Sequence, residues 1–117
     1  MQCQSSLEVL DFWELAKGSV FEYIYRPNDD TYCLLNALKS DIYSILKLNP
    51  LSILEIWYKC DVSVGSGLVI NTLAFWLNEL QYDSALYFAT DINHDACQFA
   101  KAMSEFYKVF DVLKDER

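Results

Sequence analysis

Hydrophobic residues recur at helical spacing in two stretches of the first half of the chain. In residues 5–17, Ser5 and Glu8 have the spacing of a capping box, in which a hydroxyl and a carboxylate satisfy free N–H groups at a helix start. Gly18 stands where a glycine commonly follows a helix. The second stretch begins after Pro27, where side-chain oxygens of residues 28–31 can cap a helix, and it stops at Asn49-Pro50. Its predicted apolar face consists of Leu34, Leu35, Leu38, Ile42, Ile45 and Leu46.

The second half alternates between strand-like and helix-like patterns. Residues 51–64 predict a strand, which residues 65–67 interrupt with Gly-Ser-Gly. Residues 68–80 are apolar on nearly every side, which is typical of a helix buried against a sheet, and residues 85–89 form a continuous apolar run of strand length. Alternating strands and helices predict an α/β fold with a parallel sheet and right-handed crossovers.

The end of the chain predicts one more helix. Asn93 or Asp95 can cap it, and residues 107–113 could add a short strand after it. Its predicted apolar face consists of Ala96, Phe99, Ala100, Met103 and Tyr107.

Composition narrows the class of protein. The 117 residues are 53% hydrophobic and 22% charged, which suits one packed domain and excludes a disordered chain. The formal net charge is −8 and no cluster of Lys and Arg is present, so we expect no direct contact with nucleic acid.

Cysteine spacing and hydropathy bear on location. The four cysteines are scattered without a C-x-x-C pair, so we expect no zinc site and reduced thiols. The chain starts with polar residues rather than a secretory signal, and its longest apolar stretch, residues 68–77, is too short for a bilayer. These features predict a cytoplasmic protein without a membrane partner.

One constellation carries candidate chemistry. A predicted strand leads to Gly65-Ser66-Gly67 and a helix, and the next predicted strand leads to Asp91. A glycine turn lets the backbone approach a ligand, the following helix offers free N–H groups, and a carboxylate can accept hydrogen bonds from two ribose hydroxyls. The pattern fits a nucleotide-type cofactor, and a purely structural turn is the alternative.

Three segments resemble the HemK-like glutamine methyltransferases, most closely the eukaryotic and archaeal branch that modifies the class I translation termination factor. The first is residues 25–38 (YRPNDDTYCLLNAL), the second combines residues 53–56 (ILEI) with residues 65–69 (GSGLV), and the third is residues 90–97 (TDINHDAC). They occur in the family's order. The resemblance implies a Rossmann-like parallel sheet of the class I methyltransferase type, incomplete in this chain, with N-terminal helices. It divides the chain into an N-terminal helical extension, residues 1–19, and the amino-terminal half of a methyltransferase domain, residues 20–117.

The same resemblance implies an activity and a site. The family transfers a methyl group from S-adenosylmethionine to the glutamine side chain of the factor's Gly-Gly-Gln motif, together with a small zinc-binding activator subunit. It implies that Thr31 approaches the cofactor, that Glu55, Gly65 and Gly67 line its methionine end, and that Asp91 holds its ribose.

The sequence departs from the family pattern in two places. Eight residues, 57–64, separate ILEI from GSG, six more than in the family, so Asp61 competes with Glu55 as the first-strand acid. The family's catalytic Asn-Pro-Pro-Tyr does not occur. We therefore expect a cofactor-binding half without catalytic residues. The alternatives are a non-catalytic remnant that binds a partner subunit, or a fragment of a nucleic-acid adenine methyltransferase.

Overall fold

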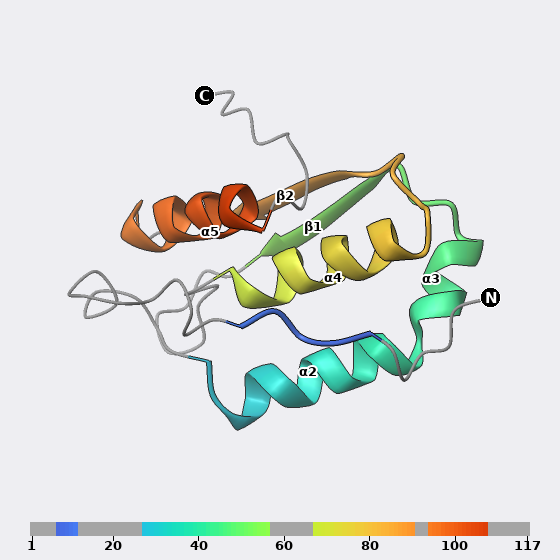
Figure 1. The fold of residues 1–117 in the computed structure, drawn as a ribbon, viewed down its shortest axis with the longest axis horizontal. Helices are drawn as coiled ribbons and strands as arrows, with labels where there is room; N and C mark the ends of the chain where they lie inside the picture. The colour runs from blue at the N-terminus through green and yellow to red at the C-terminus, as the bar shows by residue number, and fades with distance from the viewer. Residues whose placement is uncertain (1–6, 12–26, 57–66, 91–93, 108–117) are drawn as a thin grey trace.

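The structure is a computed structural model that describes residues 7–11, 27–56, 67–90 and 94–107. Helices and strands alternate in its second half, as the hydrophobic pattern predicts (Figure 1). Their order along the chain is α2 (Asp29–Ser40), α3 (Ile42–Lys47), β1 (Ser52–Ile56), α4 (Leu68–Glu79), β2 (Leu86–Thr90) and α5 (His94–Phe106).

The two strands form a parallel sheet. Ser52 lies opposite Leu86 and Ile56 opposite Thr90. Two parallel strands need a crossover connection that brings the chain back to the end of the sheet where the first strand began. Helix α4 lies in this crossover. The predicted α/β class with a parallel sheet is therefore confirmed, and this arrangement is compatible with part of a Rossmann-like fold. Of predicted residues 51–64, the structure describes a strand only over β1, and residues 57–66 lie outside the described part.

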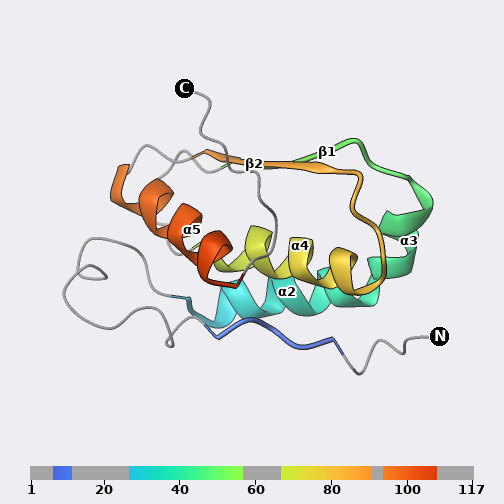
Figure 2. The ribbon, with the colours of Figure 1, turned by 45° about the horizontal axis from the view of Figure 1, so that its top comes forward.

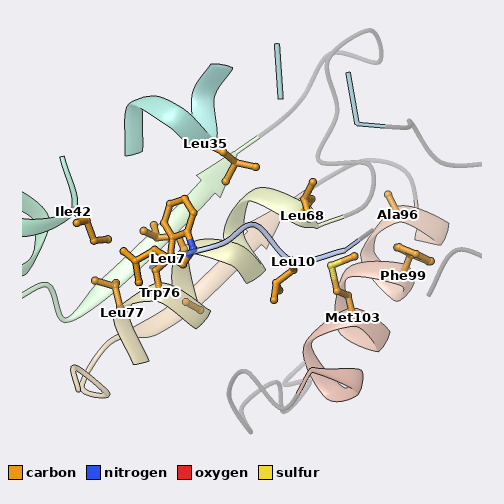
Figure 3. Packing of buried hydrophobic residues seen from close by; sticks show 12 residues of the cluster. Leu7, Leu10, Leu35, Ile42, Leu68, Trp76, Leu77, Ala96, Phe99 and Met103 are labelled. Atoms are coloured by element: carbon orange, nitrogen blue, oxygen red, sulfur yellow. The ribbon is translucent and has the colours of Figure 1, made fainter. Parts of the chain in front are cut away.

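Helix α4 is the centre of the fold because other elements cover it on several sides. It contacts α2, α5 and β2. Trp76 and Leu77 are completely buried and lie in one core with Leu68 (Figure 3). Leu73 and Ala74 belong to the same core. The absence of a polar face on this helix thus has a direct structural explanation, and the predicted burial is confirmed.

The predicted N-terminal helix is wrong over residues 7–11. Residues 7–11 are not helical. They lie along α4, where the Trp76 indole Nε1 donates a hydrogen bond to the Glu8 carbonyl (2.9 Å) and the Leu10 N–H donates one to Thr72 Oγ1 (3.4 Å). Leu7 and Leu10 are buried, so their spacing serves packing against a neighbouring helix rather than a helix of their own (Figure 3). The remainder of the predicted extension lies outside the described residues.

The helix predicted after Pro27 is divided in two. The Asp41 N–H donates to the carbonyls of both Ala37 and Leu38, and this turn separates α2 from α3. The expected apolar face persists across the break, since Leu35 and Ile42 are buried. Leu34 is an exception because it is exposed.

Helix α5 packs through the face that the sequence predicts. Ala96, Phe99 and Met103 are buried and belong to the core (Figure 3). Ala100 and Tyr107 are half-buried. The predicted strand over residues 107–113 lies almost entirely outside the described part.

The two faces of the sheet differ. Ile53 and Tyr87 pack against the core, whereas the alternate residues are exposed. The exposed face carries four large hydrophobic side chains that are 50–61% exposed: Leu54, Ile56, Leu86 and Phe88. Parallel sheets normally have both faces covered, and none of the described helices covers this one.

Candidate functional site

The predicted site residues belong to elements whose relevant ends lie together. In Figures 1 and 2, the carboxyl ends of β1 and β2 and the N-termini of α2, α4 and α5 all point toward the same end of the molecule. Ligands in open α/β folds bind outside the carboxyl ends of the strands. We call this end of the molecule the strand-end region.

Gly67 begins α4 in a backbone conformation that favours glycine. Its φ is 74°, in the left-handed region, and it is the N-cap residue of α4. A Cβ at this position would lie 2.4 Å from Ala100 Cβ and 2.7 Å from Ala100 Cα. The close approach of α5 therefore requires glycine here, independently of any ligand. The predicted contact of Gly67 with a cofactor stays a prediction.

Glu55 is the penultimate residue of β1. It pairs with Ala89 and is half-buried, on the same side of the strand as Ile53, which packs against the core. Its Oε1 atom is fully buried. A carboxylate on the helix-covered face of an otherwise apolar strand is unusual, which favours a specific role for it.

Thr31 has a structural role at the start of α2. Its hydroxyl accepts a hydrogen bond from the Asn28 N–H (3.1 Å), and its own N–H donates to Asn28 Oδ1 (3.1 Å). The two residues form a capping box, as the oxygens of residues 28–31 suggested. On the next residue, burial and then the Asp11 carboxylate raise the pKa of the Tyr32 phenol. Contact between Thr31 and a cofactor remains a prediction.

The other predicted residues lie outside the described part of the chain. These are Gly65, Asp91 and the competing acid Asp61. Asp91 directly follows Thr90, the last residue of β2, in the sequence. Its role therefore stays a prediction.

Asn71 is a buried polar residue to which the sequence analysis gave no role. Its side chain is 1% exposed and lies one turn into α4, whose residues are mostly apolar. Its Nδ2 donates to the carbonyl oxygens of Gly67 (2.9 Å) and Ala100 (3.2 Å). The signal in the sequence was an amide four residues after a turn glycine, at a position where every neighbour in the helix is apolar except Thr72.

A search of curated proteins finds a distant methyltransferase relative. The chain is similar to a release-factor methyltransferase. Over 92 residues it is 28% identical to the eRF1 methyltransferase catalytic subunit mtq2 of Schizosaccharomyces pombe, a match that covers 75% of this chain and 38% of that protein. The chain thus spans less than two fifths of the length of this relative. No protein-family model and no solved structure matches the chain.

Two described features have the chemistry of a cofactor site. The left-handed residue Gly67 leads into the 12-residue helix α4, whose N-terminal dipole favours a negatively charged group. Glu55 adds a carboxylate near the carboxyl end of β1. A helix N-terminus favours an anion and a carboxylate favours a cation, and an amino-acid group carries both charges.

In the part of the chain that the structure describes, none of the helices combines the length and the hydropathy that crossing a bilayer requires.

Proposed function

We propose that the chain is the cofactor-binding part of an S-adenosylmethionine-dependent methyltransferase that modifies the glutamine side chain of a class I translation termination factor. The supporting observation is the placement of the three family-like segments. The first segment contains the start of α2, the second contains the end of β1 and the start of α4, and the third contains the end of β2 and the start of α5. All of these element ends point to the strand-end region (Figure 1). The similarity to the eRF1 methyltransferase subunit supports the same class of reaction.

Each residue has a proposed role. The N-terminus of α4, which begins after Gly67, would attract the carboxylate of the methionine part, and Glu55 would attract its ammonium group. Asp91 would accept hydrogen bonds from the ribose hydroxyls. Thr31 would contact the same cofactor from the start of α2. The bound cofactor supplies the methyl group, and these residues orient it.

Methylating an amide requires more than this part provides. The amide lone pair is delocalised into the carbonyl group, so the acceptor must be held in line with the methyl carbon, and such positioning is worth about 7–11 kcal/mol at the extreme. The chain has no Asn-Pro-Pro-Tyr for this purpose. We propose that further polypeptide packs on the exposed sheet face and supplies it, since the relative is much longer than the matched segment.

Partners and location follow from the same proposal. A small zinc-binding activator subunit would form a heterodimer with the complete methyltransferase, and the termination factor would be the substrate. Both would be met in the cytoplasm.

One alternative has an observation in its favour. The exposed apolar face of the sheet also suits a chain that binds a partner subunit without catalysing a reaction. Binding of S-adenosylmethionine distinguishes a methyltransferase part from such a remnant, because a non-catalytic remnant has no need to retain this binding. The net charge of −8 argues against the third reading, a nucleic-acid adenine methyltransferase.

The test is calorimetric titration of the chain with S-adenosylmethionine. We expect Asp91→Ala to weaken binding by about 1.5–3 kcal/mol, the range for hydrogen bonds to a charged group. Asp83→Ala is the matched control, since Asp83 is an exposed acid in the loop before β2. This variant should bind S-adenosylmethionine with wild-type affinity. Equal affinity of wild type and Asp91→Ala would remove Asp91 from the site, and no binding by the wild type would contradict the proposed function.

A further inference from the structure

The side chain of Asn71 joins two elements that lead away from the strand-end region. Its Nδ2 lies 2.9 Å from the Gly67 carbonyl oxygen, at the start of α4, and 3.2 Å from the Ala100 carbonyl oxygen, in α5. Both neighbours are hydrogen-bond acceptors, so the amide must present its NH₂ group to them. The amide thus donates hydrogen bonds both to the residue that begins α4 and to α5.

Packing alone does not explain an amide at this position. Asn71 is 1% exposed, and its Oδ1 accepts no hydrogen bond from the described residues. Burying such a group costs free energy that an apolar side chain of equal size would not cost. The benefit that offsets this cost must come from the two donated hydrogen bonds.

At the same place, Gly67 allows α5 to lie very close to the start of α4. A Cβ on Gly67 would lie 2.4 Å from Ala100 Cβ, so α5 lies directly against the turn that begins α4. We call Gly67, Asn71 and Ala100 the helix junction. The junction fixes the distance between α4, which follows the glycine turn, and α5, which begins three residues after Asp91 in the sequence.

We propose that Asn71 is a positioning residue that holds Gly67, at the start of α4, and the middle of α5 at the spacing that one cofactor molecule needs. This inference rests on the proposed function, in which the turn and Asp91 contact opposite parts of S-adenosylmethionine. Asn71 acts through Gly67 and α5 and does not itself contact the cofactor.

Two substitutions separate its two hydrogen bonds. Asn71→Leu keeps the approximate size and removes both donors. Asn71→Ser retains a hydroxyl that can donate to the carbonyl four residues earlier, Gly67, but is too short to reach Ala100. Asn78→Leu is the matched control, because Asn78 is exposed on the same helix.

The first measurement is S-adenosylmethionine affinity by calorimetry, at a temperature where circular dichroism shows each variant to be folded. We expect at least a tenfold loss for Asn71→Leu, a smaller loss for Asn71→Ser, and less than a twofold change for Asn78→Leu. A folded Asn71→Leu variant with wild-type affinity would overturn the inference.

The second measurement needs no cofactor and covers the case in which the wild type does not bind it or Asn71→Leu does not fold. Amide resonances of the ligand-free protein report the junction directly. We expect Asn71→Ser to shift the resonances of α5 residues around Ala100 while the Gly67 resonance changes little. Unchanged α5 resonances would overturn the link between Asn71 and α5, whereas shifted resonances without any cofactor binding would uphold that link and overturn the proposed function together with the cofactor role of Asn71.

Discussion

Gly67 is subject to two independent constraints at the residue scale. Its backbone is left-handed, with φ at 74°, and its α-carbon lies against Ala100. Any L side chain at this position meets both constraints, even in the absence of a ligand. A glycine that the sequence pattern associates with a cofactor is thus also required for the packing of α5 on α4.

Gly67→Ala should therefore destabilise the fold. The left-handed conformation costs about 1–2 kcal/mol for a residue with a Cβ, and overpacking against Ala100 adds about 1–3 kcal/mol. We expect the free energy of unfolding in urea to fall by about 2–5 kcal/mol. The double variant Gly67→Ala/Ala100→Gly should recover little of the loss, because the new Cβ would still lie 2.7 Å from the α-carbon of residue 100 and glycine destabilises a helix interior. Wild-type stability of the single variant would refute the account of this position.

Tyr87 makes stability depend on pH at the alkaline end. Burial, and then the neighbouring Tyr82, raise the pKa of Tyr87 from 10.0 to about 12. Between pH 10 and 12 the unfolded chain therefore loses this proton before the folded chain does, so the free energy of unfolding decreases as pH rises. Below pH 10 both states are protonated and the contribution is fully present.

The measurement is urea denaturation of wild type and Tyr87→Phe from pH 8 to pH 12. We expect the stability of Tyr87→Phe to decline less steeply above pH 10. Tyr43→Phe, at an exposed position of α3, is the control substitution. Parallel curves for wild type and Tyr87→Phe would show that the phenol ionises equally in both states.

At the scale of elements, the end of α4 shows how a helix can stop without glycine. The Gln81 N–H donates to the Asn78 carbonyl (2.9 Å) and the Tyr82 N–H donates to the Leu77 carbonyl (2.8 Å). This is a Schellman motif, and Gln81 adopts its left-handed position with φ at 69°. Tyr82 and Leu77 both pack in the core, which stabilises the motif despite the strain at Gln81.

Gln81→Gly should stabilise the protein. It relieves about 1–2 kcal/mol of left-handed strain and loses about 0.4–1 kcal/mol through the greater freedom of the unfolded chain. We expect a net gain of about 0.5–1 kcal/mol in urea denaturation. The control is Ala102→Gly in the exposed interior of α5, which should lose about 1 kcal/mol. A destabilised Gln81→Gly variant would contradict the assigned motif.

Local patterns predicted the elements that are continuous in sequence. The apolar run of α4, the strand-length run of β2, and the capping oxygens before α2 each determine structure through neighbouring residues, and β1 occupies the beginning of the longer strand predicted over residues 51–64. The features that sequence could not predict depend on distant partners. Residues 7–11 are held on α4 by Trp76 and Thr72, and the donors of Asn71 need an acceptor 29 positions away in α5. The break at Asp41 also had no glycine or proline to indicate it.

The candidate site was predictable to the same extent. The motifs placed Glu55 and Gly67 on the correct elements, at β1 and at the start of α4. The capping role of Thr31 and the demand of α5 on Gly67 emerged only from the fold. A resemblance carries residue identities, but it does not distinguish a residue needed for packing from one needed for a ligand.

At the scale of the whole molecule, the described fold has one covered and one exposed sheet face. Helix α4 packs on one side, and Leu54, Ile56, Leu86 and Phe88 remain exposed on the other. At the strand-end region, by contrast, the carboxyl ends of both strands and the N-termini of α2, α4 and α5 lie together (Figure 1). The account therefore predicts that cofactor binding and methyl transfer are separable, with binding carried by this part of the protein.

The central claim is that S-adenosylmethionine binds at the strand-end region. The most direct test is a titration of the labelled protein with S-adenosylmethionine, followed through its backbone amide resonances. The account predicts that the largest shifts belong to Gly67, Leu68 and the last residues of β1 and β2, while α3, at the opposite end of the molecule, is unaffected (Figure 1). Shifts centred on α3 or on the exposed sheet face, or no shifts at millimolar cofactor, would contradict it.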